Sequence, residues 1–303
     1  MYNRLKKIYK DSLVKATIPH DFDHYEWFLS PSDDYLGIEK KALEKKDIRL
    51  LEAFLQKVEP EQFTLTPREK WWHEYLFSQT DGHIETPYQA YDTCRFIHFR
   101  FTEPFSQKNV WKEAITAFFD EDIELIWESP TSCVVIELSR SYPKSEEFQA
   151  FSDIVDITAS DFYSTVKLYI GSTVAINEKT KELYNWESKC FSLSMKARKK
   201  SNIHTFEQAI PYLVTGQLEK ELVSKIKELF GSDLKGEQEL IQNVKIYIEN
   251  NLNVSLTAKK LFMHRNSLQY RIDKFSERTG IDIKNFQGAL AAYLAIIILE
   301  TER

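Results

Sequence analysis

One stretch near the end of this 303-residue chain, Asn253 to Phe275, constrains its fold more than any other. It predicts two short helices joined by a tight corner, the first over Thr257 to Phe262 and the second from about Asn266. Ala258 is small enough to let two steeply crossing helices approach closely, and Met263 is expected to fill the corner with an apolar side chain. The pattern indicates a helix-turn-helix.

The second predicted helix has an apolar inner stripe and a polar outer face. Leu268, Ile272 and Phe275 recur at i, i+4 and i+7, which places them on one side at 100° per residue. The residues around its start are hydrogen-bonding or cationic, as is typical of side chains that contact base edges and phosphates. The candidate DNA-contacting residues are His264, Arg265, Asn266, Ser267, Gln269, Tyr270, Arg271 and Lys274.

These candidates divide by their position on the helix. A recognition helix enters the major groove by its N-terminal end, so Arg265, Asn266 and Ser267 are expected to read bases. The four candidates further along are expected at base edges or phosphates at the margins of the interface. His264 is expected to cap the helix rather than touch DNA. The alternative is an ordinary pair of amphipathic helices with a solvated face.

The run TAKKLFMHRNSLQYRIDKFSERTGIDI, residues 257 to 283, resembles the C-terminal DNA-binding domain of the PucR/CdaR type of bacterial transcription regulators. One departure is Phe262, where many helix-turn-helix units carry Gly at the corner, and it bears on the geometry of the turn. The positions that match the family pattern are Thr257, Ala258, Leu261, His264, Arg265, Asn266, Ser267, Leu268, Tyr270, Arg271, Thr279 and Gly280.

Charge is distributed unevenly along the chain, whose formal net charge is −6. From Glu237 to the end, nine Lys and Arg stand against eight Asp and Glu, so this segment carries +1 and the remainder −7. Between Leu256 and Lys274, five basic residues stand against one acidic residue. An acidic body with a local basic patch fits a DNA-binding protein whose non-specific affinity is modest.

Several features predict a cytoplasmic protein that does not enter a membrane. The longest apolar run, Ala289 to Leu299, has eleven residues, which is too short to span a bilayer. The N-terminal MYNRLKKIYKDSLVK lacks the apolar segment of a signal peptide. Cys94, Cys133 and Cys190 are odd in number and far apart, so we expect reduced thiols.

The predicted fold class is α+β in several parts. Residues 1–85 are predicted to be mainly helical, with helices over Ile48 to Val58 and from Pro67 onward. Residues 217–236 are predicted to form a connector helix and a linker, with the best linker over Gly231 to Gly236. Residues 237–303 form the predicted helix-turn-helix domain, closed by an apolar helix over Phe286 to Leu299.

Residues 86–216 are predicted to form an α+β layer domain. The periodicities indicate the order β-α-β-β-α-β-α-β, with a central hairpin whose turn is Ser129-Pro130-Thr131. The order of elements and the sequence YIGST (Tyr169 to Thr173) are similar to the degenerate cyclase-like (GGDEF-type) domain of PucR/CdaR regulators. A working cyclase of that fold needs glycines and paired carboxylates at the hairpin, where this chain has Glu128-Ser129-Pro130-Thr131-Ser132. Catalysis is therefore not expected.

No metal or cofactor site is predicted. His20, Asp21, Asp23 and His24 gather near the N-terminus, but no spacing there matches a ligand signature, so a solvated loop is the preferred interpretation. The rest of the chain shows no P-loop, Gly-x-Ser-x-Gly or His-Glu-x-x-His motif.

The resemblance implies a cytoplasmic transcription regulator that binds double-stranded DNA as a homodimer, controls metabolic genes, and has a small-molecule effector as a candidate partner. The upstream parts would sense, dimerise or relay. A different class of function is also open: a small-molecule-binding or adaptor protein whose helical C-terminal domain binds protein rather than DNA. A cyclase relic that retains activity is the third interpretation.

Overall fold

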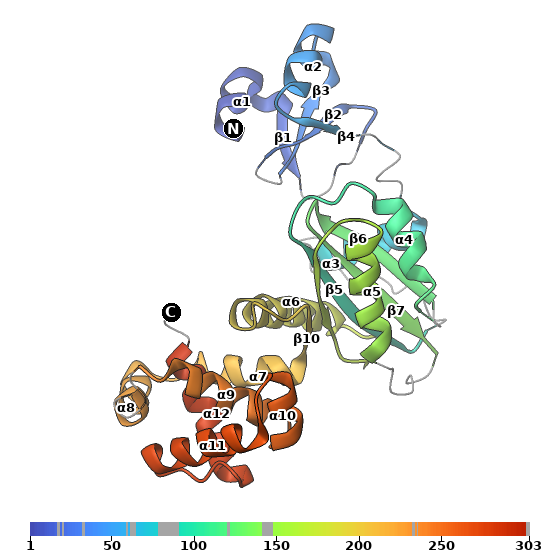
Figure 1. Cartoon of the computed structure of the whole chain (residues 1–303). Helices are drawn as coiled ribbons and strands as arrows, with labels where there is room; N and C mark the ends of the chain where they lie inside the picture. Colours follow the sequence, from blue (N-terminus) through green and yellow to red (C-terminus); the bar gives the residue numbers. More distant parts are fainter. Residues whose placement is uncertain are drawn as a thin grey trace. The chain divides into compact units, whose positions relative to one another are not determined.

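The computed structural model divides the chain into two compact units, Met1–Phe206 and Glu207–Arg303. Helices and strands are labelled in Figure 1. The structure describes residues 1–16, 19, 21–31, 34–58, 60, 65–77, 91–119, 122–140, 148–231, 234 and 236–300.

The first unit begins with a small antiparallel sheet, in the strand order β1-β3-β2-β4. The prediction of a mainly helical N-terminal region is corrected here, although the α+β class of the whole chain is confirmed. The predicted helix over Ile48 to Val58 ends at Glu52, and Gln56–Val58 pair with β2 instead. The elements are α1 (Tyr2–Tyr9), β1 (Leu13–Ala16), β2 (Tyr25–Leu29), β3 (Tyr35–Glu39), α2 (Lys45–Glu52) and β4 (Gln56–Val58).

The segment predicted as a solvated loop leads directly into this sheet, with Asp21, Asp23 and His24 exposed before β2 begins at Tyr25. Trp27 on β2 is fully buried, and its indole lies over Gly37 on β3, where a Cβ atom would come within 2.9 Å of the ring. Gly37 is therefore the residue that lets the ring lie flat on the sheet. His24 lies just before β2 with its Nε2 3.4 Å from Glu39 Oε1, and His20 lies outside the described residues.

The second sheet of this unit has the strand order β10-β8-β5-β7-β6. Its β-α-β-β-α-β core places the first and third strands side by side in the middle, as in ferredoxin-like folds, and β10 adds to one edge parallel to β8. The predicted order of elements is confirmed except for one additional short strand, β9, which follows β8 and pairs with β5. They are β5 (Thr93–Phe101), α4 (Lys108–Thr116), β6 (Asp122–Ser129), β7 (Ser132–Ser139), α5 (Phe148–Ser160), β8 (Val166–Ile170), β9 (Val174–Ala175), α6 (Thr180–Ala197) and β10 (Ile203–Thr205).

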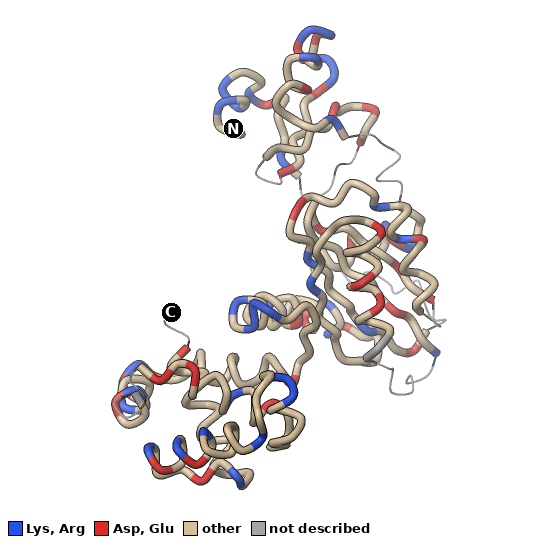
Figure 2. The backbone as a smooth tube through the Cα atoms, viewed as in Figure 1, with Lys and Arg blue, Asp and Glu red and all other residues tan. Residues whose placement is uncertain are grey.

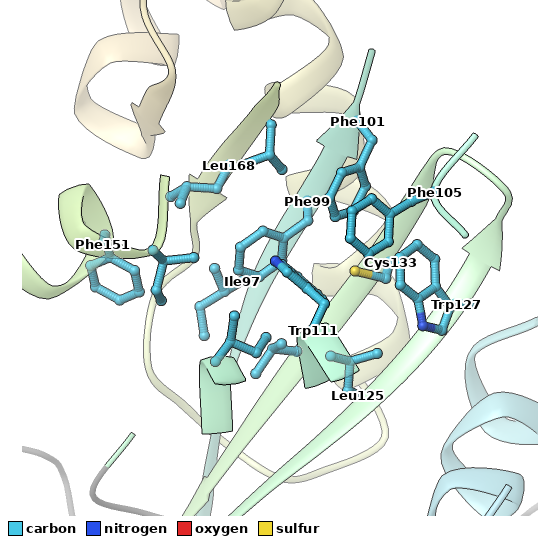
Figure 3. Packing of buried hydrophobic residues seen from close by; sticks show 14 residues of the cluster. Ile97, Phe99, Phe101, Phe105, Trp111, Leu125, Trp127, Cys133, Phe151 and Leu168 are labelled. Atoms are coloured by element: carbon cyan, nitrogen blue, oxygen red, sulfur yellow. The ribbon is translucent and has the colours of Figure 1, made fainter. Parts of the chain in front are cut away.

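Helices cover both faces of this sheet, so successive residues of β5 are buried on opposite sides. Figure 3 shows one face, where Trp111 of α4 and Phe151 of α5 pack against Ile97, Phe99 and neighbouring strands. On the other face, Phe96 contacts α3 and α6 through a cluster that includes Trp72 and Tyr184. The near-continuous burial of β5 follows from this arrangement.

Helix α3 (Pro67–Phe77) starts at the predicted residue and packs on this second sheet, which we call the central sheet. Its start is a capping box: the Glu69 N–H donates to Thr66 Oγ1, and the Thr66 N–H donates to Glu69 Oε2. Pro67 occupies the first helical position, where its missing N–H is harmless. The predicted domain boundary at residue 85 would therefore assign α3 and the central sheet to different domains, although the two pack against each other.

The turn of the central hairpin is closed by its own hydroxyl groups. Ser129 Oγ lies 2.7 Å from Ser132 Oγ and accepts from the Thr131 N–H at 3.1 Å. The carboxylate of Glu128 accepts a hydrogen bond from the Tyr184 hydroxyl, and burial raises the pKa of that phenol, with Glu128 adding to the effect. The single carboxylate of this turn is thus engaged with α6.

The second unit is helical throughout its described elements. Leu234, inside the predicted linker, is buried in the core of this unit, so the linker prediction is corrected at that residue. None of the helices in the described part of the chain has the length and apolar character needed to cross a membrane. The helices are α7 (Phe206–Thr215), α8 (Lys220–Gly231), α9 (Gln238–Glu249), α10 (Val254–Lys260), α11 (Arg265–Thr279) and α12 (Phe286–Glu300).

Candidate nucleic-acid interface

Helices α10 and α11 form the predicted pair, and side chains fix where each begins. Asn253 caps α10 by accepting a hydrogen bond from the Leu256 N–H at 2.9 Å. His264 caps α11, because its Nδ1 accepts from the Asn266 N–H at 3.2 Å. The cap holds the His264 ring against the helix end, as predicted. Both helices begin slightly earlier than the sequence pattern predicts.

The corner between α10 and α11 is a Schellman motif. The Phe262 N–H donates to Lys259 O at 3.2 Å, and the Met263 N–H donates to Ala258 O at 3.0 Å, which are the two bonds of that motif. Phe262 takes the left-handed conformation that the motif requires, with φ of 53°. Met263 packs against the core of the unit, as predicted, and Ala258 is buried within it.

The predicted inner stripe of α11 holds the helix in place. Leu268, Ile272 and Phe275 are each fully buried, in one cluster with residues of α9 and α12. At the other end of the helix, Gly280 adopts φ of 71° and its N–H donates to Ser276 O at 2.9 Å, so Gly280 is the C-terminal cap. With both ends capped and one face buried, the outer side chains of α11 stand on a rigid element.

The predicted base-reading residues lie together at the exposed start of α11. Arg265, Asn266 and Ser267 are all exposed. Their side chains make no hydrogen bond or ion pair with any residue in the described ranges. Tyr270, one turn further on, is 68% exposed. Gln269 is partly buried, and its Nε2 donates to Asp273 Oδ1 at 3.1 Å.

Arg271 and Lys274 lie on a different flank of α11, beside the start of α9. Arg271 Nη1 lies 2.6 Å from Glu239 Oε1, and Lys274 Nζ lies 2.9 Å from Glu237 Oε1. Arg278, which the sequence reasoning did not select, reaches the same Glu237 oxygen at 3.1 Å. The hydrogen bond from Lys274 and the nearby Arg278 charge lower the pKa of Glu237.

We call the space between this flank and the start of α9 the α9–α11 groove. It is an open hollow of about 600 Å³ whose walls carry charges of both signs, because the two glutamates face the cations of α11. Figure 2 shows blue and red segments alternating along these helices. The residues that line the groove are Glu237, Glu239, Leu240, Asn266, Ser267, Tyr270, Arg271 and Lys274.

The sequence reasoning missed the two glutamates because nothing local links them to α11. In the sequence, Glu237 precedes Lys274 by 37 residues, and Glu239 precedes Arg271 by 32 residues. Acidic residues at the start of a helix are visible in the sequence. They are stabilised there by the dipole of their own helix, so their presence does not indicate a distant cationic partner. Only the packing of α9 against α11 brings these charges together.

Comparison with known proteins gives the same segment a family match. The family described as the PucR C-terminal helix-turn-helix domain matches residues 240–298, which run from α9 to α12. The match therefore includes α10, α11 and the corner between them.

Relatives extend the similarity to nearly the whole chain. The uncharacterized protein YxkF of Bacillus subtilis (strain 168) is 34% identical over 305 residues, which cover 98% of each chain. The carbohydrate diacid regulator of Escherichia coli (strain K12) is 42% identical over 50 residues, covering 16% of this chain and 13% of that protein. The purine catabolism regulatory protein of Bacillus subtilis (strain 168) is 30% identical over 81 residues, covering 24% and 15%.

Proposed function

Because the chain belongs to the PucR/CdaR type of bacterial transcription regulators, we propose that it binds specific sites on double-stranded DNA through the start of α11. One observation carries the proposal. Arg265, Asn266 and Ser267 project together into solvent from the capped end of a helix whose opposite face is fully buried. Arg pairs with guanine and Asn with adenine in the major groove, and such contacts need a rigid support.

The remaining candidates serve the margins of this interface in the proposal. Gln269 and Tyr270 follow the base-reading residues along the helix, while Arg271 and Lys274 supply positive charge for phosphates. In the free protein these two cations are held by Glu239 and Glu237. Binding to DNA then exchanges carboxylate partners for phosphate oxygens, which reduces the net gain from each contact.

The experiment is retention of genomic DNA fragments by the purified full chain across a salt series. We expect the protein to retain a small set of fragments selectively, and its affinity for DNA to fall steeply as the salt concentration rises. The genes beside those fragments identify the regulated functions. An adaptor that binds protein through its C-terminal unit would retain no fragment selectively, and that result would exclude the proposal.

Two substitutions connect the retention to α11. Arg265→Ala and Asn266→Ala should each weaken binding to a retained fragment by about 1–3 kcal/mol and change binding to random duplex little. Gln287→Ala is the matched control, because Gln287 is an exposed polar residue on α12. If both variants fold normally and bind the fragment as tightly as the parent, α11 does not read its sequence.

The proposed assembly is a homodimer in the cytoplasm. A single helix-turn-helix reads few base pairs, and two copies that bind half-sites about one helical turn apart specify a longer operator. Exposed apolar side chains on helices of the second unit, Leu222, Leu229 and Leu290, offer surface for a second copy. Light scattering at micromolar concentration should give about twice the 35.7 kDa chain mass. A monomer both free and on DNA would contradict it.

The first unit is proposed to sense or relay a signal, with a small molecule as its candidate source, and to lack catalytic activity. The sheet of residues 93–205 takes the part of a degenerate cyclase-like domain in this proposal. Its hairpin turn has no glycine, and its carboxylate, Glu128, is bonded to Tyr184. Incubation with GTP or ATP and Mg²⁺ or Mn²⁺ should form no cyclic dinucleotide above a blank, whereas a metal-dependent product would overturn the assignment.

A further inference from the structure

Phe262, at the corner between α10 and α11, combines two unfavourable properties. Its φ is 53°, in the left-handed region that a bulky L-residue rarely adopts. Phe262 is 98% exposed, more than any other large hydrophobic residue in the described part of the chain. The conformation is costly by roughly 1–3 kcal/mol, and the exposed ring adds an apolar surface that water does not favour.

The fold needs the conformation of residue 262 but not its ring. The Schellman motif places this position in the left-handed region, where Gly is the ordinary choice. Gly280 takes that choice at the end of α11, with φ of 71°. The bonds that close the corner come from the backbone of Phe262 and Met263, so a residue without a side chain would close it equally well. The ring is therefore not required to close the corner.

The position of Phe262 points to a role for the ring. It lies two residues before the cap His264 and three before Arg265, so it borders the exposed start of α11. In the proposed complex this end of the helix enters the major groove. An exposed ring beside it meets the apolar parts of the duplex, which are the C5-methyl groups of thymine and the faces of deoxyribose.

We propose that Phe262 is a DNA-contacting residue that buries its ring against a thymine methyl group or a deoxyribose. The inference rests on the proposed function and adds a residue that was not among the candidates. It explains why a strained residue with an exposed ring occupies the corner, since the benefit appears only in the complex. Observed backbone strain at an exposed position favours a functional role of this kind.

The chain provides a matched control for the ring. Tyr163, after α5 in the first unit, also has positive φ, 52°, and is 91% exposed. Tyr163→Gly removes an exposed aromatic ring and the same kind of strain as Phe262→Gly, but at a position outside the family match to residues 240–298. Phe262→Asn serves as a second variant, because Asn tolerates the left-handed region while it lacks the apolar ring.

The first measurement is thermal unfolding beside binding of the full chain to a 30-base-pair duplex taken from a retained genomic fragment, at low salt. Phe262→Gly and Phe262→Asn should unfold at the parent temperature or above it, because strain is relieved. Both should bind the duplex about tenfold more weakly, the effect of exposing part of a ring that was buried. Tyr163→Gly should bind like the parent.

A second duplex, with uracil in place of thymine, separates the two apolar targets because it lacks only the methyl groups. If the ring meets a methyl group, the parent binds the uracil duplex more weakly and Phe262→Asn binds both alike. If it meets deoxyribose, Phe262→Asn is weaker than the parent by the same factor on both duplexes. Either pattern supports the proposal.

Two outcomes contradict the inference, and they differ in what else they contradict. If the parent binds duplex with a steep salt dependence and the Phe262 variants bind both duplexes equally tightly, Phe262 does not contact DNA while the proposed function stands. If the folded parent binds no duplex at any salt concentration, the proposed function fails and this inference with it.

Discussion

The central sheet and helix α11 use their polar side chains in opposite ways. On the sheet, Arg95 of β5 and Glu137 of β7 are register neighbours that form an ion pair, with side chains only 9% and 4% exposed. Inside the core, Trp111 Nε1 donates to Thr158 Oγ1 at 2.9 Å. At the start of α11, by contrast, three successive polar side chains project into solvent.

Under the proposed function, this difference separates a region that holds the architecture from a region that recognises DNA. Polar groups buried in a sheet must be paired, because an unpaired buried group is costly, and once paired they fix a single packing. Polar groups held outward on a rigid helix are available to a partner. The five predictions that follow test this division, and each changes residues either in the sheet with its covering helices or on α11 and its flank.

The largest expected effect comes from Trp111→Ala in the central sheet. Trp111 is fully buried and makes T-shaped contacts with Phe99 and Phe101, with ring centroids 5.2 Å apart in each case. Its removal should lower the free energy of unfolding by about 3–5 kcal/mol. Trp186→Ala, at a position 42% exposed on α6, is the control and should cost much less. Urea unfolding measures both, and DNA affinity of the folded variant should be unchanged.

Leu268→Ala makes the corresponding change in the second unit. The side chain is fully buried under α11, so its truncation should cost about 2–5 kcal/mol in the stability of that unit. Because α11 carries the proposed interface, DNA binding should weaken as well, unlike in Trp111→Ala. A variant that loses stability but retains full affinity would show that the interface does not depend on the packing of α11.

How much the sequence predicts depends on how local the determining contacts are. The stripe Leu268, Ile272 and Phe275 and the cap Gly280 are visible in the sequence, because helix periodicity and capping involve neighbours along the chain. The order of elements in the central sheet follows for the same reason, since its strands run up to nine residues. Pro67 marks the start of α3 correctly because the cap is local.

The features that escaped prediction depend on contacts between distant residues. The N-terminal strands have three to five residues, too few to show an alternating pattern, and their pairing is decided by the whole sheet. Glu237 reaches Lys274 only after α9 and α11 pack. The sequence marks Phe262 as a departure from Gly at the corner, but it does not predict the left-handed conformation of this bulky residue, because local propensity disfavours it.

The third prediction concerns Lys108, a buried amine at the start of α4, the helix that packs on this sheet. It is 5% exposed, lies 4.5 Å from the centroid of the Trp127 ring and donates to the Tyr35 hydroxyl at 2.9 Å. Burial lowers the pKa of Lys108 to about 7, against 10.5 ordinarily, while nearby Cys133 acts weakly in the opposite direction.

The sign of the pH effect follows from that lowered pKa. Between pH 7 and 10.5 the unfolded chain holds a proton on Lys108 that the folded chain has lost, so stability rises with pH in this window. Relative to Lys108→Met, which cannot titrate, the parent should gain about 1 kcal/mol per pH unit from about pH 7.5 to 10, and the gain is lost as pH falls through 7. Parallel pH profiles of the two proteins would contradict it.

The smallest effects are expected on the flank of α11 that faces α9. There the cations are paired within the protein, as on the sheet, and are also proposed to contact DNA. Lys274→Ala should change stability by less than about 1 kcal/mol, because a partly exposed ion pair contributes little and Arg278 stays beside the same carboxylate. Its effect on DNA should be clearer: affinity should fall alike for all sequences, and the salt slope should decrease by about one unit if Lys274 contacts a phosphate.

Glu237→Gln tests the same pair from the other side and should act in the opposite direction. The substitution removes the carboxylate that holds Lys274 and Arg278 in the free protein, so both cations become available and binding to random duplex should strengthen. Glu228→Gln, on exposed α8, changes the net charge equally and is the control for a general charge effect. Two results together would show that this flank does not contact DNA: equal binding by Glu237→Gln and Glu228→Gln, and an unchanged salt slope for Lys274→Ala. The ion pairs of the flank would then be structural, like the pair on the sheet, and recognition would be confined to the start of α11.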